Sequence, residues 1–340
     1  MIKKKINKAM FEKLKPTGSQ PARLYGLAKI HKINIPLRPV LSMPGSAYYN
    51  IANQVAKWLS VVEECNVNSS TKEISDKLSN IELNENEELV SFDVKSLYTN
   101  VPLQEAINDC TELLYSGKYA KPPVDRTTFK ELVILCSSDV VLLSNGEYYK
   151  QVDGLAMGSP PAPLLANGWM NKYDKEIKGE AKLYSRYMDD VLREIHKDKV
   201  EEKLKEINNL NSEFLQFTIE RENDNSIPFL DMLITRSDKS LSSKWYTKST
   251  DTGITLNFHA LSPIRYKRSV VSGLVHRTYR SCSTQAHFDE SLKKGKSILE
   301  RNQYYSSFYE PIINNTLRKI FERNADVIEQ DAEEQEVEKK

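Results

Sequence analysis

Between residues 47 and 62, hydrophobic side chains recur every three or four positions. This spacing places them on one side of a helix, so the segment is predicted to form an amphipathic helix whose apolar face joins the core. Residues 88–94 instead alternate between apolar and polar side chains and are rich in strand-favouring residues. They predict a strand that ends at Asp93, followed by a turn and a helix that begins near Pro102.

The middle of the chain shows a helical pattern, a hairpin signal and a second helical pattern in turn. Residues 126–138 are predicted to be helical, and residues 139–152 to form two short strands about Asn145-Gly146, a dipeptide typical of a tight hairpin turn. The Gly- and Pro-rich segment 154–163 predicts a rigid loop. This loop is expected to lead into a helix over residues 164–177.

Two acidic side chains follow in a predicted turn. Residues 182–192 have the pattern of two strands joined by a turn that carries Asp189 and Asp190. Side chains in such a turn are exposed to whatever occupies a neighbouring cleft. Beyond them, the pattern predicts one short helix and two strands, over residues 201–209, 214–220 and 227–235.

The last third of the chain changes from strands to helices. Residues 245–246 and 254–258 are predicted to pair as a hairpin, and the pattern becomes helical from Ser262 onward. One face of this helix is apolar, with Val271 and Val275 near its middle. Another face is basic and carries Arg265, Lys267, Arg268, Arg277 and Arg280.

The composition is that of a folded globular protein and argues against several classes. The chain has 340 residues, of which 39% are hydrophobic and 28% charged. Its longest apolar run, residues 132–136, is far shorter than a membrane helix, and the first residues lead into no signal-peptide core, so no membrane association is expected. Its four cysteines are widely spaced without a Cys-x-x-Cys pair, which disfavours structural zinc and a disulfide scaffold.

The net charge of +1 conceals a strong gradient along the chain. Residues 236–280 hold nine Lys and Arg against two Asp, whereas the last twenty residues hold eight acidic side chains against three basic ones. Such runs are often no more than solvated faces. We expect residues 321–340 to form an acidic tail that is disordered or a frayed helix, and we keep the basic segment as a candidate surface for nucleic acid.

Three acids are candidates for chemistry: Asp93 at a strand end, and Asp189 with Asp190 in a turn about a hundred residues later. Carboxylates from different strands can bridge two divalent metal ions, which activate an attacking hydroxyl and clamp a leaving phosphate oxygen. Magnesium suits this role because it prefers oxygen ligands and few protein ones. An Asp-Asp pair in a turn is by itself most often structural.

The surrounding segments give the three acids more weight. Phe92-Asp-Val-Lys-Ser-Leu-Tyr-Thr-Asn-Val-Pro102, Met157-Gly-Ser-Pro160 and Tyr187-Met-Asp-Asp190, in this order, resemble the A, B and C motifs of a reverse transcriptase palm. Residues 24–32 with 36–40, and residues 228–234, resemble the Penelope-like retroelement branch in particular. The resemblance covers approximately residues 21–310.

This resemblance implies an α+β fold of the right-hand polymerase type, with fingers, a palm built on an antiparallel sheet and a helical thumb. Residues 1–85 are expected to form the N-terminal part and fingers. The palm is expected over residues 86–235, with a fingers insertion at 103–150, and the thumb over residues 236–320.

The resemblance also implies roles for the residues of the palm. Asp93 and Asp189 would bind two Mg²⁺ or Mn²⁺ ions, with Asp190 beside them as a supporting carboxylate and the backbone of Val94 as a further ligand. The primer 3′-hydroxyl would then attack the α-phosphate of a dNTP. Tyr98 matches the position of a bulky ring that excludes ribonucleotides, which favours DNA synthesis.

The remaining implied contacts involve the nucleotide, the primer and the template. Arg38 and one of Lys29 or Lys32 would neutralise the triphosphate. Gly158 and Ser159 would form a loop against the nucleotide. The expected primer grip and template-primer contacts are Phe229, Leu230, Asp231, Arg265, Lys267, Arg268 and Arg277.

Three features depart from the family pattern or leave a choice open. Arg193 places a charge on a strand that is usually apolar, so that it either points outward or marks a degenerate copy. Asp153-Gly154 stands where some reverse transcriptases have a Gln near the nucleotide, and receives no role here beyond a backbone contact. A general acid is expected among Lys199, Lys203 and Lys205, and the spacing does not choose between them.

The first hypothesis is therefore an RNA-directed DNA polymerase of a retroelement that extends a DNA primer along an RNA template, with target priming at a chromosomal 3′ end. A chromosomal target implies the nucleus, with the cytoplasm as the alternative. No segment after Lys319 resembles an endonuclease, and the sequence leaves open whether a separate endonuclease supplies the primer. An RNA-dependent RNA polymerase and a degenerate palm that only binds nucleic acid remain as alternatives.

Overall fold

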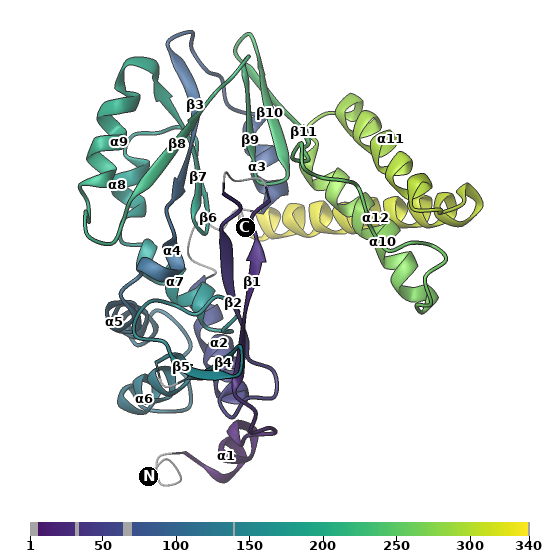
Figure 1. Ribbon diagram of the computed structural model, residues 1–340. Coiled ribbons are helices and arrows are strands. Elements are labelled where there is room, and N and C mark those ends of the chain that lie inside the picture. Colours follow the sequence, from purple (N-terminus) through teal and green to yellow (C-terminus); the bar gives the residue numbers. More distant parts are fainter. Residues whose placement is uncertain (1–5, 31–33, 64–69, 139, 339–340) are drawn as a thin grey trace. The chain divides into compact units, whose positions relative to one another are not determined.

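The computed structural model describes residues 6–30, 34–63, 70–138 and 140–338 (Figure 1). The chain forms two compact units: residues 1–69 with 86–221, and residues 70–85 with 222–340. We call them unit 1 and unit 2. These divisions differ from the expected ones, because residues 70–85 and 222–235 fold with the segment expected to be the thumb.

A four-stranded antiparallel sheet forms the centre of unit 1, in the order β6-β7-β3-β8. Its strand β3 is almost wholly buried, because it carries apolar side chains on both faces, Leu89 on one and Val90 and Phe92 on the other. Helices α8 and α9 lie beside this sheet (Figure 1). The elements are β3 (Glu87–Val94), β6 (Tyr184–Tyr187), β7 (Asp190–His196), β8 (Phe217–Arg221), α8 (Asp174–Lys178) and α9 (Val200–Asn208).

Helices pack next to this sheet around the larger hydrophobic core. The amphipathic helix predicted over residues 47–62 is confirmed as α2 (Tyr49–Glu63). The helix predicted over residues 164–177 is instead two helices, because the chain turns after Met170 before α8 begins. The remaining helices of the unit are α1 (Lys8–Leu14), α4 (Leu97–Asn100), α5 (Leu103–Leu114), α6 (Arg126–Ser137) and α7 (Ala162–Met170).

A second sheet in unit 1 has the strand order β2-β1-β4-β5. The hairpin predicted about Asn145-Gly146 is confirmed, and both residues have the positive φ that such a turn requires, 49° and 85°. The strands are β1 (Ala22–Ala28), β2 (Leu37–Ser42), β4 (Val141–Ser144) and β5 (Glu147–Lys150).

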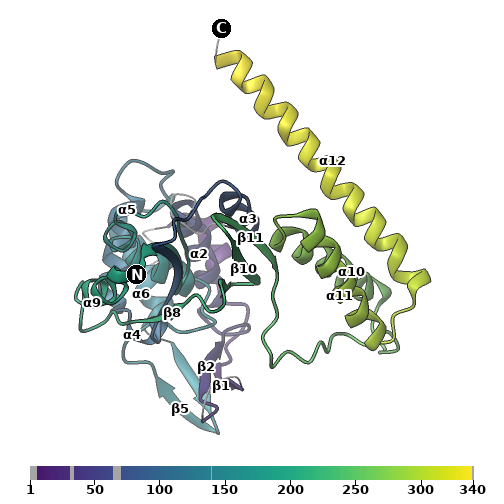
Figure 2. The ribbon, with the colours of Figure 1, turned by 90° about the horizontal axis from the view of Figure 1, so that it is seen from above.

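Unit 2 combines a three-stranded sheet with long helices (Figure 2). The helix α3 joins it from an early part of the chain: Ser75 hydrogen-bonds Ser243 at 3.0 Å, and the amide of Leu83 donates to the carbonyl of Lys239. The elements are α3 (Thr71–Leu78), β9 (Ser226–Phe229), β10 (Met232–Ser237), β11 (Ser240–Trp245), α10 (Ile264–Ser281), α11 (Gln285–Arg301) and α12 (Ser306–Glu338).

The structure bears on two expectations for unit 2. The predicted pairing of residues 245–246 with 254–258 is wrong: β11 pairs with β10, and Asn302 holds the later segment by accepting from the Thr255 amide and donating to the Gly253 carbonyl. The acidic tail, for which disorder and a frayed helix were expected, has a helical backbone as far as Glu338.

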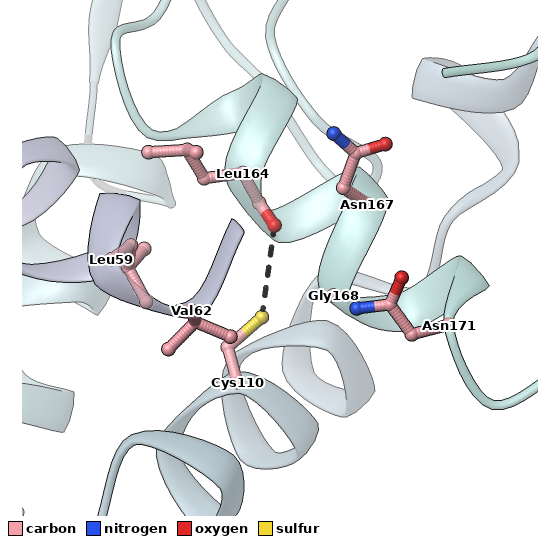
Figure 3. Close-up of a pocket in the computed structure, with 7 residues that line it drawn as sticks. All are labelled: Leu59, Val62, Cys110, Leu164, Asn167, Gly168 and Asn171. Atoms are coloured by element: carbon pink, nitrogen blue, oxygen red, sulfur yellow. Dashed lines mark hydrogen bonds between the residues drawn. The ribbon is translucent and has the colours of Figure 1, made fainter. Parts of the chain in front are cut away.

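In unit 1, helices α2, α5 and α7 approach closely and line a small pocket (Figure 3). Its volume is about 10 Å³, which is room for a single water at most. Cys110 lines it, and burial raises the pKa of its thiol to about 12, so this cysteine is a neutral packing group. The pocket is too small to bind a substrate.

The close approach of α5 and α7 predicts the effect of a methyl group at Gly168. A Cβ there would lie 2.3 Å from the Cys110 sulfur, so Gly168→Ala should destabilise the protein by about 1–3 kcal/mol. Gly273, also in a helix, has no atom within 4 Å of such a Cβ, and Gly273→Ala should stabilise by roughly 0.4–1 kcal/mol. Urea unfolding measures both changes, and equal effects would contradict the packing argument.

Candidate active site

The register of β3 with β7 brings the candidate carboxylates together. Asp93 stands directly opposite Asp190, and Thr218 of β8 stands opposite Asp93 on its other side. Residues opposite each other across a sheet share a face, so both carboxylates lie on one side of the sheet. Asp189 precedes Asp190 in the turn, and its carbonyl accepts a hydrogen bond from the Val94 amide at 3.1 Å.

The turn between β6 and β7 contains a strained residue. Met188 has φ 58°, in the left-handed region that side chains other than glycine rarely adopt. Such a conformation costs roughly 1–2 kcal/mol, so contacts around the turn must hold it in place. The strain lies directly before Asp189.

The pKa of Asp189 is raised above its ordinary value. Burial is the largest cause, and the negative charge of Asp93 adds to it. The cationic side chains of Arg38 and Lys29 act in the opposite direction and lower the pKa. Two of the residues expected to bind a triphosphate therefore lie within electrostatic range of this carboxylate.

The two neighbouring carboxylates suit a divalent cation. Mg²⁺ commonly takes one or two protein carboxylates and completes its ligands with water and substrate phosphates. Asp93 and Asp189 repel each other, and a cation between them would relieve that repulsion. Within the part of the chain that the structure describes, no group of three His, Cys, Asp or Glu could hold a metal ion by itself. The donor set therefore fits an ion shared with a phosphate.

The loop over residues 154–160 is tied to β2, the strand that carries Arg38. The Leu41 amide donates to the Met157 carbonyl at 2.7 Å. Gly158 has φ 101°, and a Cβ there would lie 2.2 Å from the Leu41 carbonyl oxygen, so only glycine allows this approach. This contact fixes the loop against the same strand that presents Arg38.

The same loop is also tied to the segment that follows Asp93. The Leu155 amide donates to the Tyr98 carbonyl at 2.6 Å. A Cβ at Gly154 would lie 2.8 Å from the carbonyl oxygen of Thr99, and its φ is 77°. Tyr98 itself lies on α4, half-buried against the core. The loop therefore connects the expected sugar-contacting residue with the expected triphosphate-binding strand.

The other nucleotide-binding candidates differ in how they are placed. Lys29 is half-buried just after β1, and its amide donates to the Pro36 carbonyl at 3.0 Å. Ser159 is buried, and its hydroxyl has no hydrogen-bond partner among the described residues. Lys32 lies outside the residues that the structure describes.

The candidates for primer and template contacts all belong to unit 2. Leu230 has φ 54° in the turn between β9 and β10, while Phe229 is buried beside it. Asp231 pairs with Arg277 of α10 at 3.4 Å, both side chains remaining largely exposed. Arg265 and Lys267 lie over the rings of Tyr266 and Phe258, and Arg268 is exposed on the same helix.

Arg193 does not point outward. It is 7% exposed, and its guanidinium donates to the carbonyls of Ile177 in α8 and Glu194. An arginine commonly binds the last carbonyls of a helix in this way. Burial lowers its pKa, and Glu194 and Glu206 oppose that effect. Arg193 thus attaches β7 to α8.

Asp153 and Lys203 both have structural contacts. Asp153 accepts from the Leu103 amide at 3.2 Å and from the Gly154 amide at 2.7 Å, so it caps α5 and steadies the loop. The Lys203 ammonium donates to the Glu176 carbonyl and to Glu206, each at 2.8 Å.

Sequence reasoning missed the most extensively bonded side chain near the turn. Arg186 is 1% exposed and forms an ion pair with Asp174, with its Nε 2.7 Å from the carboxylate. The signal lay in the strand alternation: Arg186 directly precedes Tyr187 and stands opposite the buried Val191, so its side chain had to lie on the core side.

Two families of known sequences match parts of this chain. Residues 1–221 match the family described as reverse transcriptase (RNA-dependent DNA polymerase), and residues 254–314 match the animal helix-turn-helix domain. The second match spans α10, α11 and the start of α12. No curated protein matches the sequence.

Solved structures are similar to the chain in fold. Telomerase from Candida albicans, in complex with a TWJ fragment of telomeric RNA, has a TM-score of 0.55 at 12% identity over 92% of this chain and 61% of its own. An RNA-dependent RNA polymerase of a human picobirnavirus has a TM-score of 0.56 at 14% identity, over 89% of this chain and 62% of its own. The chain therefore spans less than two thirds of the length of the telomerase and of this polymerase. A sicinivirus RNA-dependent RNA polymerase has a TM-score of 0.50 at 10% identity, over 92% of this chain and 71% of its own.

Likeness at these identities shows the fold alone, and that fold is the right-hand polymerase expected from the sequence. Its mixed α+β character with an antiparallel sheet agrees with the strands described above. None of the described helices has an apolar stretch long enough to span a bilayer.

The raised pKa of Asp189 predicts that this carboxylate destabilises the metal-free protein. At a pH above the raised pKa, Asp189 is ionised in both the folded and the unfolded protein, and its charge is disfavoured in the folded one. At a pH below the ordinary pKa of Asp, the carboxyl group is protonated in both states and this cost disappears. Asp189→Asn should therefore raise the metal-free free energy of unfolding at pH 8 by roughly 0.5–2 kcal/mol, a gain that disappears toward pH 3.

Denaturant unfolding in EDTA across that pH range measures the effect. Asp198→Asn is the control, because the Asp198 side chain is 88% exposed. A gain for Asp189→Asn that stays constant with pH would contradict the electrostatic origin.

Proposed function

The chain belongs to the reverse transcriptase (RNA-dependent DNA polymerase) family, and on that premise we propose that it extends a DNA primer by copying an RNA template. The observation that carries the proposal is the register that sets Asp93 opposite Asp190, with Asp189 in the adjoining turn and the charges of Arg38 and Lys29 acting on it. Carboxylates that can share divalent ions, with cationic side chains near enough to act on them, suit nucleotidyl transfer from a triphosphate.

In this proposal the acids bind metal ions and the cationic side chains bind the triphosphate. Two divalent ions, Mg²⁺ or Mn²⁺, would activate the attacking hydroxyl and neutralise the leaving phosphate oxygens. Asp93 and Asp189 would hold these ions, supported by Asp190 and the Val94 backbone, while Arg38 and Lys29 would bind the triphosphate. The primer 3′-oxygen would form a bond to the α-phosphorus while the bond from that phosphorus to the β-phosphate oxygen breaks. Pyrophosphate would leave, and the hydroxyl proton would pass to solvent.

We also propose that Tyr98 selects the sugar. Its backbone is fixed by the hydrogen bond from Leu155, and Gly154 lies against the same turn, so the ring has a defined position close after Asp93. A ring held at the sugar C2′ would clash with a ribose hydroxyl. This role supports DNA rather than RNA as the product.

Unit 2 is proposed to hold the template-primer duplex by its phosphates. The segment over residues 236–280 is strongly basic, and α10 exposes Arg265, Arg268 and Arg277. Phosphate contacts of this kind position a duplex without reading its sequence. Phe229, Leu230 and Asp231 form the tight hairpin turn proposed to grip the primer end.

Two groups of motif residues support a particular kind of retroelement. Residues 24–32 with 36–40, and residues 228–234, favour a Penelope-like retroelement, which would prime on a chromosomal 3′ end in the nucleus and use a separate endonuclease. The similar telomerase was solved in complex with telomeric RNA, which supports an RNA template here.

Primer extension tests the proposed activity. Wild-type protein should extend oligo(dT) on poly(rA) with dTTP only when Mg²⁺ or Mn²⁺ is present. Asp189→Asn should reduce the rate by about 100-fold or more, because a transition-state contact is lost. Duplex binding should stay within about threefold, because it depends on the basic helix rather than on the acids.

Asp198→Asn is the matched control and should retain wild-type extension. Binding without metal-dependent extension by the folded wild type would contradict the proposal and favour a palm that only binds nucleic acid. Parallel loss of duplex binding in Asp189→Asn would show that the acid is structural.

Removal of the Tyr98 ring should admit ribonucleotides. Tyr98→Ala is expected to lower the preference for dTTP over UTP by about 10-fold or more, since a steric clash is removed. The preference is measured as the ratio of kcat/KM values on the same duplex. Tyr119→Ala, also packed against the core, controls for general destabilisation, and equal preferences in both variants would refute the assignment.

A further inference from the structure

Arg186 uses its whole guanidinium within a buried network. Its Nε donates to Asp174 at 2.7 Å, and its Nη2 donates to Asp174 and to Asn171, each at 2.8 Å. Its Nη1 donates to the Asn167 side chain at 3.0 Å and to the Met188 carbonyl at 3.1 Å. These five hydrogen bonds equal the donor capacity of an arginine.

The partners of Arg186 come from different elements of unit 1. Asn167 lies on α7, Asn171 follows its last turn, and Asp174 begins α8. Figure 3 shows the two asparagines on the same side of the pocket, one helical turn apart. The hydroxyl of Tyr184 also donates to Asp174, at 2.6 Å. The buried charge is thus paired and fully hydrogen-bonded, which is the condition for tolerating it.

The contact with Met188 has a consequence for the acids. Met188 is in the left-handed region, and its carbonyl is held by Arg186 on one side of the turn. The next carbonyl, that of Asp189, is held by the Val94 amide from β3. Two successive peptide groups are therefore each held by a hydrogen bond from another part of the chain, which is how a strained conformation persists.

We propose that Arg186 is a positioning residue for Asp189: it holds the strained Met188 peptide so that the Asp189 carboxylate faces Asp93 and can share a divalent cation with it. This inference rests on the proposed function, which supplies the need for that cation. It assigns Arg186 a role beyond joining β6 to α7 and α8.

The chain provides its own comparison in Arg193. Arg193 lies on the neighbouring strand, is also buried, and bonds to α8 through the Ile177 carbonyl. Its hydrogen bonds reach Ile177 and Glu194, which lie away from the turn. A purely structural role predicts similar consequences for changing either arginine, whereas the positioning role predicts a difference.

The variants Arg186→Lys and Arg193→Lys compare the two buried arginines while keeping the positive charge at each position. Lysine has three donors on one atom, so it can pair with Asp174 but cannot also span the distance to Met188. In Arg186→Lys, kcat should fall by about 10-fold or more at an unchanged KM for primer-template. The Mn²⁺ concentration that half-saturates the protein, read from the paramagnetic resonance of free Mn²⁺, should rise by about 10-fold. Arg193→Lys should change either value by less than about twofold.

A glycine at position 188 distinguishes loss of positioning of Asp189 from loss of packing around Arg186. Glycine adopts the left-handed conformation without strain, so Met188→Gly added to Arg186→Lys should recover about half or more of the lost Mn²⁺ affinity. If Arg186→Lys does not fold, Tyr184→Phe is the milder variant. It removes one hydrogen bond from the same network and should weaken Mn²⁺ binding by about two- to tenfold.

Equal losses in Arg186→Lys and Arg193→Lys, or wild-type Mn²⁺ binding by folded Arg186→Lys, would overturn the inference. So would unchanged Mn²⁺ binding in Tyr184→Phe. Absence of extension by the wild type would instead contradict the proposed function, and the Mn²⁺ titrations would still decide the role of Arg186.

Discussion

The alignment of β3 with β7 is the constraint on which the candidate site depends. It sets Asp93 opposite Asp190, and the strand period of two means that a shift of one residue would move Asp93 to the other face of the sheet. The buried side chains of Val90 and Phe92 fix this alignment, because either shift would place polar groups in the core. The same apolar residues that stabilise the sheet therefore also determine which acids meet.

Backbone contacts also hold the loop over residues 154–160 next to β2 and to the segment after Asp93. The loop over residues 154–160 contacts the turn after Asp93 through Gly154 and contacts β2 through Gly158. Both glycines have positive φ and lie too close to carbonyl oxygens to carry a side chain. Main-chain groups, rather than side chains, thus connect the strand of Arg38 with the acids of the palm.

Local signals in the sequence predicted much of this arrangement and missed the rest for physical reasons. Asp93 was placed at a strand end by alternation alone, and Asn145-Gly146 predicted its hairpin because both positions need positive φ. The Arg186 network could not be foreseen, since its partners converge only after α7 and α8 pack. For the same reason the chain pattern did not show that Asn302 would hold residues 253–258, or that α3 would join a unit formed mostly from later residues.

The membership of α3 in unit 2 has a practical consequence for dissecting the protein. The chain leaves unit 1 at residue 70, returns at 86 and leaves again after 221, so the two units are interleaved along the sequence. A fragment that stopped at residue 221 would keep α3, with its buried Ile74 and Leu78, and lose β11 and α10, which pack against that helix. Exposed apolar side chains of this kind promote aggregation. A separable unit 1 would therefore have to be made by replacing residues 70–85 with a short linker, as well as by ending the chain early.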